Sequence, residues 1–390
     1  MEDITDWRLF KTVETISDVS PSPDSVSVRW SDGRVSRYDR FWLRDNCSCS
    51  TCYLALTREQ LFEIVDAPED LRVGGALCDA GGALAVTWSD GHRSVYSPGW
   101  LRANAYDEAS RAERDAARQA PTLWGAARSD DLPTFRYHDL MRDDAILLRW
   151  LVAVRDVGLV LVLDVPAERD ALLTVAHRIS HIRETNFGRV FDVVSKPTPD
   201  SAAYTSVNLP PHTDLPTREL QPGLQFLHCL VNDATGGESI FVDGFAIAEA
   251  MRDEADEDFA VLAETPMEFW NRDSRTDYRW SGPLLGLEAG GRLSEIRFAN
   301  FLRGPINAPA QRMPAIYRAL RRFQAMTREA RFRVERRLSA GDMWVFDNRR
   351  VLHARREFDP RSGNRHLQGV YIDRDDLHSR IRVLERDLTS

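Results

Sequence analysis

The chain has 390 residues, and its 51 Lys and Arg residues against 60 Asp and Glu residues give it a formal net charge of −9. Its hydrophobic fraction of 43% and charged fraction of 28% are ordinary for a globular protein, which excludes a fibrous or mainly disordered chain. No apolar run reaches 18 residues and the start, MEDITDWRLF, lacks a basic and then apolar signal segment, so we expect a cytoplasmic protein that does not bind membranes.

An internal repeat occupies the first quarter of the chain. The string VRWSDGRVSRYDRFWLR, starting at Val28, matches VTWSDGHRSVYSPGWLR, starting at Val86. Each copy alternates apolar and polar residues on both sides of an Asp-Gly turn, a pattern typical of a β-hairpin. Two copies predict a small β-rich domain over residues 1–105.

Five cysteines are an odd number, and three of them crowd into the string CSCSTC. Such a cluster, in a chain with no expected secretory signal, favours a metal site over a disulfide framework. A tetrahedral Zn²⁺ site needs a fourth ligand, and His92 is the candidate because the first repeat has Arg34 at the matching position. The alternative is a loop of reduced thiols beside an exposed histidine. The clustered cysteines are Cys47, Cys49 and Cys52, whereas Cys78 and Cys229 are expected to be reduced bystanders.

Helical patterns follow the repeat. Residues 106–130 predict a charged helix and a linker. Asp143–Val157 predicts an amphipathic helix that ends at Gly158, and residues 159–164 predict a buried strand. Residues 168–183 predict another helix.

From about residue 203 onward, short strand candidates dominate, interrupted by helical patterns near 246–263 and 313–330. Many short strands without regular βαβ alternation favour a jelly-roll-type double sheet, mainly β with inserted helices, over residues 131–390. A Rossmann fold is disfavoured because no GxGxxG string opens a helix after a strand. The strand candidates are AYTSVNL, GLQFLHCLV, SIFVDGF, MEFW, EIRFAN, DMWVFDN and HLQGVYID.

The string PHTD contains one histidine and one carboxylate, His212 and Asp214, at positions i and i+2. In an extended segment these two side chains share a face and can hold one ion. One more histidine would complete the facial triad of a non-haem Fe(II) oxygenase, and His353 in VFDNRRVLHARR is the candidate. Arg365, further on, suits the far carboxylate of a dicarboxylate co-substrate.

The other histidines carry weaker signals. His177 and His181 lie at i and i+4 on one predicted helix face, but no ExxH or HExxH pattern supports a metal site there. His228 lies in an apolar strand candidate and is interpreted as a core residue.

Together these strings closely resemble the γ-butyrobetaine dioxygenase family, within the wider taurine-dioxygenase-like superfamily. The resemblance rests on LRDNCSCSTCYL, the later WSDGH, PHTDLP, QFLHCL, TGGES-FVDGF, GD-WVFDNRRVLHARR and NRHLQGVYID, and it covers nearly the whole chain. It implies an amino-terminal zinc domain, a helical linker, and a double-stranded β-helix that hydroxylates a trimethylammonium-containing acid with Fe(II), O₂ and 2-oxoglutarate. It also implies carnitine biosynthesis, a homodimer, and ascorbate as an accessory reductant.

Carried over by position, the resemblance assigns a role to each matching residue. Cys47, Cys49, Cys52 and His92 look like structural Zn ligands, and His212, Asp214 and His353 look like the Fe ligands. Arg365 looks like the 2-oxoglutarate anchor, with Ser239 close to the co-substrate. Aromatic positions that match the cage for the trimethylammonium group are Phe187, Phe191, Tyr204 and Tyr371.

The chain departs from the family where the acidic end of the substrate should bind. The positions that match the family's polar side chains are Ser201, Leu215 and Ala299, and the last two donate no side-chain hydrogen bond. An alternative anion clamp could come from Arg218, Asn300 and Arg303. Such a clamp would suit a phosphonate, as in 2-(trimethylamino)ethylphosphonate, as well as a carboxylate.

Two alternatives remain at this stage. A relative acting on trimethyllysine or another amine would use the same iron chemistry. In a different class, the cysteine cluster could form a zinc-finger-like interaction module beside a degenerate barrel. The negative net charge and the absence of a basic helix after the cysteine loop argue against nucleic acid as the partner.

Overall fold

The computed structural model describes residues 10–194 and 205–388. Contacts divide the chain into two compact units, one ending at Gln119 and the other beginning at Ala120. Gln119 lies inside the segment 106–130 that was predicted as a linker. Among the described helices, none is both long enough and apolar enough to span a bilayer.

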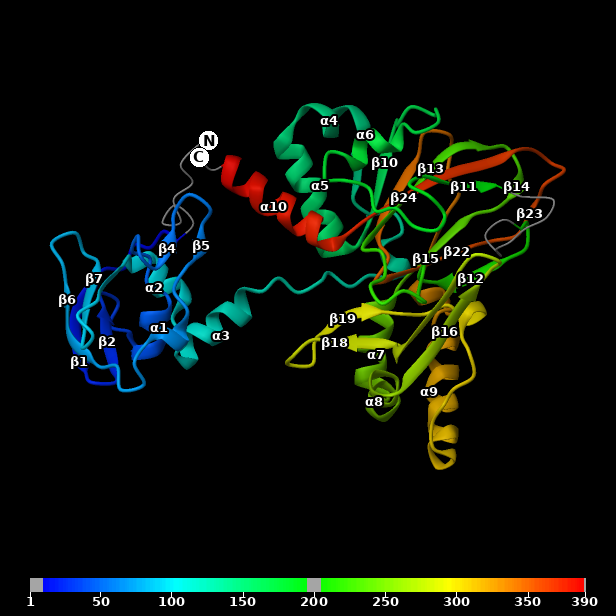
Figure 1. Ribbon diagram of the computed structural model, residues 1–390. Helices are drawn as coiled ribbons and strands as arrows, with labels where there is room; N and C mark the ends of the chain where they lie inside the picture. The colour runs from blue at the N-terminus through cyan, green and yellow to red at the C-terminus, as the bar shows by residue number, and fades with distance from the viewer. Residues whose placement is uncertain (1–9, 195–204, 389–390) are drawn as a thin grey trace. The chain divides into compact units, whose positions relative to one another are not determined.

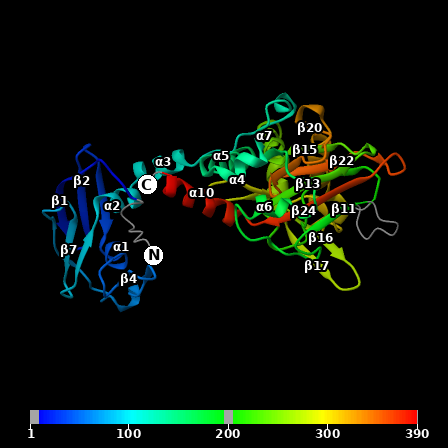
Figure 2. The ribbon, with the colours of Figure 1, turned by 90° about the horizontal axis from the view of Figure 1, so that it is seen from above.

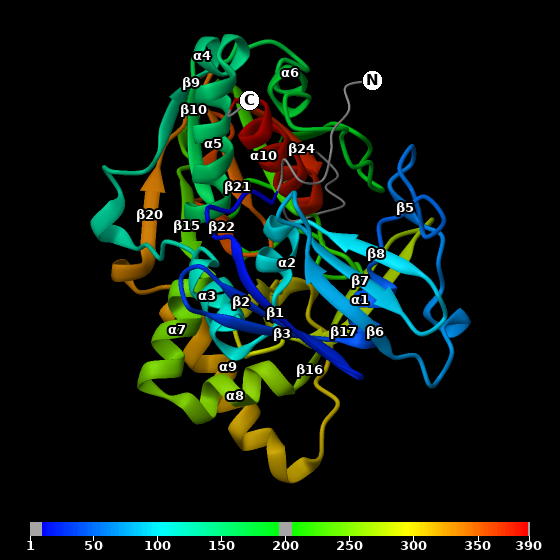
Figure 3. The ribbon, with the colours of Figure 1, turned by 90° about the vertical axis from the view of Figure 1, so that its left-hand side faces the viewer.

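The first unit contains two three-stranded antiparallel sheets, β1-β2-β3 and β6-β7-β8, visible in Figure 3. Each predicted hairpin is confirmed, with its turn glycine, Gly33 or Gly91, in the left-handed region at φ 85° or 82°. A short helix follows each hairpin. The bounds are β1 Ile16–Ser22, β2 Ser25–Trp30, β3 Val35–Asp39, α1 Arg40–Asp45, β4 Tyr53–Leu54, β5 Glu59–Gln60, β6 Val73–Cys78, β7 Leu84–Trp88, β8 Arg93–Tyr96, α2 Pro98–Asn104 and α3 Glu108–Ala117.

The two repeats contact each other reciprocally. The hydroxyl of Tyr38 donates to the carbonyl of Leu101 at 2.9 Å, and the matching hydroxyl of Tyr96 donates to the carbonyl of Leu43. Their tryptophans, buried in one shared core, each donate to a serine of the same hairpin. The repeats therefore stabilise each other as a pseudo-symmetric pair.

Helix α3 is attached to the first unit. Arg34, at the position that matches His92, forms an ion pair with Glu113 of this helix. Asp107 caps the helix by accepting from the backbone amide of Ser110 at 2.9 Å, and it also accepts from the hydroxyl of Ser36. The first repeat thus has an ion pair where the second has a histidine.

The second unit is built on two facing sheets, seen as two layers in Figure 2. A six-stranded sheet has the order β11-β24-β13-β21-β10-β9, and a four-stranded sheet has the order β12-β22-β15-β20. Their bounds are β9 Thr134–Arg136, β10 Leu159–Leu163, β11 Phe191–Val194, β12 Leu209–His212, β13 Leu224–Asn232, β15 Ser239–Asp243, β20 Arg333–Arg336, β21 Met343–Asp347, β22 Val351–Arg355 and β24 Arg365–Ile372.

The apolar layer between the sheets confirms the predicted jelly roll. Phe241 of the smaller sheet packs on Trp344 of the larger one, with ring centroids 5.0 Å apart, inside a cluster drawn from both sheets. Three two-stranded pieces complete the strands of this unit. They are β14 Thr235–Gly236 with β23 Phe358–Asp359, β16 Pro266–Arg272 with β17 Asp277–Pro283, and β18 Leu285–Leu287 with β19 Leu293–Ile296.

Helices cover the outer faces of this unit (Figure 1). The predicted helix at 143–157 is confirmed as α5, capped by the Asp143 side chain and ended by Gly158 at φ 78°. The helix predicted over 168–183 is shorter in the structure, where α6 covers only part of it, and Asp170 at φ 65° breaks the helical path on its amino-terminal side. The bounds are α4 Tyr137–Arg142, α5 Asp144–Val157, α6 Leu172–Ala176, α7 Gly244–Glu254, α8 Asp256–Glu264, α9 Met313–Met326 and α10 Arg374–Leu388.

Candidate functional site

The three predicted iron ligands lie together inside the jelly roll. His212 ends β12 and faces His353 of β22 directly across the strand pair, with ring centroids 4.1 Å apart. Asp214 follows two residues later, and its Oδ1 lies 3.2 Å from His212 Nε2 and 3.6 Å from His353 Nε2. Ligand atoms bound about 2.1 Å from one ion at right angles would be about 3 Å apart, so this arrangement fits a metal.

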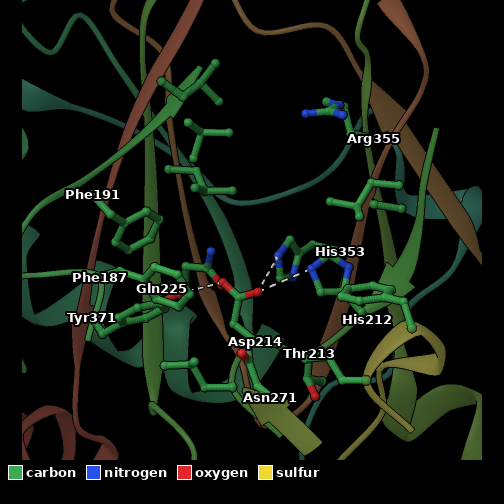
Figure 4. A pocket seen from close by; sticks show the side chains of 18 of the residues that line it. Phe187, Phe191, His212, Thr213, Asp214, Gln225, Asn271, His353, Arg355 and Tyr371 are labelled. Atoms are coloured by element: carbon green, nitrogen blue, oxygen red, sulfur yellow. Dashed lines mark hydrogen bonds and ion pairs between the residues drawn. The ribbon is translucent and has the colours of Figure 1, made fainter. Parts of the chain in front are cut away.

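Hydrogen bonds fix the orientation of these ligands. His212 Nδ1 donates to the carbonyl of Pro210 at 3.0 Å, which leaves Nε2 for a metal. The side chain of Asn348 makes two hydrogen bonds with the backbone of Asp214. Its Oδ1 accepts from the Asp214 amide at 2.7 Å, and its Nδ2 donates to the Asp214 carbonyl at 3.0 Å. Leu215 then turns the chain with φ 53°. The turn and the two strands hold the three side chains on one side of the cavity (Figure 4).

The electrostatics favour the protonation states that a metal requires. Burial, together with the nearby His212, lowers the pKa of His353 to about 3. Burial alone would raise the pKa of Asp214, but His353, His212 and Tyr371 hold it well below the usual range for a carboxyl group. Neutral imidazoles and an ionised carboxylate are the forms that bind metal ions.

We expect Tyr371→Phe to weaken Fe(II) binding by about tenfold, the low end of the about 10–100-fold range for hydrogen-bond partners of metal ligands. The Tyr371 hydroxyl donates to Asp214 Oδ2 at 2.7 Å, and the variant keeps the aromatic ring. Anaerobic Fe(II) titration measures the effect. The matched control is Tyr317→Phe on the exposed surface of α9, and unchanged affinity in Tyr371→Phe would show that this bond does not support the site.

A cavity of about 500 Å³ opens beside the triad, and one end of it is cationic. Arg365 of β24 is 9% exposed and lies over the ring of Phe358, 5.6 Å from its centroid. Burial, with a contribution from Arg355, lowers the pKa of Arg365 to about 10, so it stays protonated at neutral pH. Ser239 pairs with Arg355 across the β15–β22 ladder and also lines this end.

Arg355 was missed by the sequence prediction. It lies two residues after His353 on β22, so strand alternation places both on the cavity side, and this signal was present in VLHAR. Its guanidinium donates to the carbonyls of Thr205 and Val207, at 2.6 and 2.9 Å. A carboxylate at this end would meet two buried guanidinium groups.

The aromatic candidates form one wall of the same cavity. Phe191 stacks on Tyr371 with centroids 4.9 Å apart, and Phe187 packs against this pair (Figure 4). Tyr204, predicted for the cage, and Ser201, predicted near the acidic end, lie outside the described residues. The described part of the wall therefore offers three aromatic rings to a quaternary ammonium group.

The candidates for the anion clamp do not line this cavity, although Leu215 does. Arg218 stacks over Tyr278 at 3.4 Å and donates to Asn186, while Asn300 is exposed and accepts from Gln324. Ala299 is fully buried, and Arg303 forms a β-bridge with Phe269. Four consecutive residues at the end of β16 line the cavity instead, and the sequence prediction missed them. They are Trp270, Asn271, Arg272 and Asp273.

The second cluster of ligand-type side chains lies in the first unit. His92 Nε2 is 3.3, 3.6 and 3.7 Å from the sulfur atoms of Cys47, Cys49 and Cys52. Tetrahedral Zn²⁺ with normal bond lengths would separate its N and S ligands by about 3.6 Å. Arg44 donates to the Cys52 sulfur at 3.2 Å. Although burial opposes ionisation, hydrogen bonds from Thr51 lower the pKa of Cys49 to about 6, so the site fits zinc thiolate chemistry.

Within the described residues, no other group of His, Cys, Asp and Glu meets the geometry of a metal site. His177 contacts the carbonyl of Ser180 and the side chain of Arg189, whereas His181 contacts the hydroxyl of Ser180. His228 is fully buried, as predicted for a core residue, and burial lowers its pKa to about 4.

Comparisons with known proteins match both units. The family model described as Taurine catabolism dioxygenase TauD, TfdA family matches residues 116–371, and Gamma-butyrobetaine hydroxylase-like, N-terminal, matches residues 18–102. Gamma-butyrobetaine dioxygenase of Pseudomonas sp. (strain AK-1) is 57% identical over 383 residues, 98% of this chain and 100% of that protein. The human enzyme of that name is 30% identical over 93% of this chain and 94% of its own length. Trimethyllysine dioxygenase of Meyerozyma guilliermondii is 27% identical over 93% and 94%.

Proposed function

This chain belongs to the TauD, TfdA dioxygenase family, on its γ-butyrobetaine dioxygenase branch, and we propose that it hydroxylates γ-butyrobetaine or a closely similar trimethylammonium acid. It is an Fe(II)- and 2-oxoglutarate-dependent enzyme. The observation that carries the proposal is one cavity that joins the His212, Asp214 and His353 triad to a cationic end and an aromatic wall.

Each part of the cavity has a distinct task in this proposal. His212, Asp214 and His353 would hold iron and leave its remaining positions open to 2-oxoglutarate and O₂. Iron and 2-oxoglutarate, when bound, would let O₂ act as the oxidant: one oxygen atom enters succinate as 2-oxoglutarate loses CO₂, and the other converts a substrate C–H bond to C–OH. Arg365, with Ser239 and Arg355 beside it, would bind the far carboxylate of 2-oxoglutarate.

The aromatic wall selects the substrate. The faces of aromatic rings attract a quaternary ammonium ion, which gives up little hydration when it binds among them. Phe187, Phe191 and Tyr371 lie beside the triad, so a cation bound there holds the rest of a short molecule next to the metal ligands. The same walls exclude water from the reacting carbon.

We expect the purified protein to form succinate from 2-oxoglutarate when Fe(II), O₂ and γ-butyrobetaine are all present. Omitting iron or the trimethylammonium acid should reduce succinate to background. Side-by-side assays with trimethyllysine and with the phosphonate 2-(trimethylamino)ethylphosphonate would identify the preferred substrate. Iron binding without turnover of any of these compounds would instead favour a non-catalytic protein, in which a zinc-finger-like interaction module lies beside a degenerate barrel.

We favour γ-butyrobetaine over trimethyllysine because the chain is 57% identical to a dioxygenase named for the former and 27% identical to one named for the latter. The phosphonate stays a second candidate, since a guanidinium group binds either anion.

The cellular context of the enzyme is also a proposal. Reduced cysteine ligands fit the cytoplasm, where thiols are kept reduced. The resemblance implies a homodimer, and light scattering of the purified protein would test it. We further propose that residues 1–105 form the zinc domain, 106–130 a linker and 131–390 the catalytic domain.

A further inference from the structure

We propose that the β16–β17 hairpin recognises the anionic end of the substrate, through the guanidinium group of Arg272 and the side-chain amide of Asn271. This inference rests on the proposed function, because it concerns the substrate of the same cavity. Both residues line the cavity, and neither was among the predicted anion-binding residues. The chemistry recognised is a carboxylate or a phosphonate on a short trimethylammonium compound.

The hairpin is held firmly enough to position such contacts. Opposite Asn271 in the strand pair lies Tyr278, whose ring is covered by the guanidinium of Arg218 at 3.4 Å. Arg218 in turn donates to Asn186 at 2.7 Å, and Asn186 directly precedes Phe187 of the aromatic wall. The predicted anion ligand Arg218 thus connects the hairpin to the wall instead of entering the cavity.

A second attachment lies at the base of the hairpin. The amide of Gly304 donates to the carbonyl of Glu268 at 2.7 Å, and Phe269 forms a β-bridge with Arg303. A Cβ atom at Gly304 would lie only 3.1 Å from the Trp270 ring, so the chain packs closely there. These contacts pre-organise the run 270–273, which lowers the ordering cost of binding.

The charges on the hairpin suit an anion. Asp273, the one acidic residue that the hairpin adds to the cavity lining, accepts hydrogen bonds from its own turn. Its carboxylate accepts from the amides of Arg275 and Thr276 and from the hydroxyl of Thr276, at 2.7 to 2.8 Å. Asp277 lies opposite Arg272 in the strand pair, but its carboxylate is paired with Arg279 at 2.7 Å. The ion pairs of the described residues do not include Arg272, so its guanidinium can make a bidentate contact with an incoming anion.

The position of the hairpin separates the substrate's anion from that of the co-substrate. In Figure 4, Asn271 and Arg355 lie on opposite sides of the triad, and the aromatic rings flank it. Arg355 and Arg365 occupy the end assigned to 2-oxoglutarate. The rings, Asp214, Asn271 and Arg272 line one cavity, so a trimethylammonium acid bound to both the rings and the hairpin would lie beside the triad.

The test compares Arg272→Met with Arg275→Met, an arginine of the same hairpin that does not line the cavity. Succinate assays would use γ-butyrobetaine, its phosphonate counterpart, and the amide of γ-butyrobetaine, which keeps the trimethylammonium group but has no anionic end. We expect Arg272→Met to raise the KM about tenfold for both substrates that have an anionic end, with the KM for the amide and for 2-oxoglutarate unchanged. Arg275→Met should match the wild type throughout.

Asn271→Leu keeps the size of the side chain but removes its hydrogen bonds, and it should raise the same two KM values by a smaller factor. Equal KM values in Arg272→Met and Arg275→Met, with an active wild type, would overturn the inference while leaving the proposed function intact. So would an Arg272→Met defect confined to 2-oxoglutarate, because it would place this arginine at the co-substrate end. A wild type that turns over none of the three compounds would overturn the proposed function as well.

Discussion

Replacing His212 with alanine is expected to lower kcat/KM by more than about 100-fold while leaving the zinc content unchanged. Even hydrogen-bond partners of metal ligands contribute about 10–100-fold, and His212 is itself a proposed ligand. Its Nε2 lies 3.2 Å from Asp214 Oδ1, and its side chain is 5% exposed, so water cannot easily replace it in the same geometry. Succinate formation and metal analysis of the same sample measure both effects.

Two further variants make this result specific. His212→Gln retains more of the side-chain volume than alanine and guards against a folding defect, and it should be as inactive as His212→Ala. His138→Ala removes an exposed histidine outside the cavity lining and should keep full activity. A His212→Ala enzyme that retained its iron and most of its turnover would remove His212 from the ligand set.

The metal-binding residue types could be predicted from the sequence because both clusters combine a short local pattern with one distant histidine. His212 and Asp214 lie two residues apart, and the repeat drew attention to His92 because the first copy has Arg34 at the matching position. What brings the distant members close is strand pairing. His353 meets His212 through the register of β12 and β22, which depends on packing of the whole sheet.

The residues around the triad were harder to predict. Strand alternation places Arg355 on the same face of β22 as His353. This pattern was present in the sequence, but the sequence did not show that this face of β22 lines the cavity. The run 270–273 carried no such signal: MEFW predicts a strand, but not which sheet face or cavity its end will meet. Arg218 was assigned to the anion because of its charge, yet its guanidinium lies over the Tyr278 ring. Side-chain direction in such loops depends on long-range contacts.

Local backbone conformation explains the main error in the secondary structure. Residues 168–183 have a helical apolar pattern, but Asp170 occupies the left-handed region and its amide donates to Gln368 of β24 at 2.7 Å. This tertiary hydrogen bond competes with the amino-terminal part of the predicted helix, and α6 begins only at Leu172. Helix propensity is a weak prior in such a case.

Replacing Cys49 with serine is expected to release zinc and to destabilise the first unit without directly altering the iron site. Cys49 is the partly exposed member of the cysteine cluster, so the substitution removes a ligand with little loss of packing. Because a structural zinc site contributes its binding energy to folding, even a loss of about 2 kcal/mol would lower the melting temperature of a domain this size by about 8 °C. Calorimetry and metal analysis would measure the change.

The matched control for zinc is Cys78→Ser, which changes the same type of side chain in the same unit. Cys78 is exposed on β6 and lies outside the cluster, so this variant should keep its zinc and its melting temperature. The core of the first unit, which includes Trp30 and Trp88, does not contain the metal ligands, so Cys49→Ser should lose stability without becoming fully unfolded. Retained zinc and an unchanged melting temperature in Cys49→Ser would contradict the four-ligand assignment. Loss of iron-dependent turnover with zinc and stability intact would mean that the two metal assignments must be revised together.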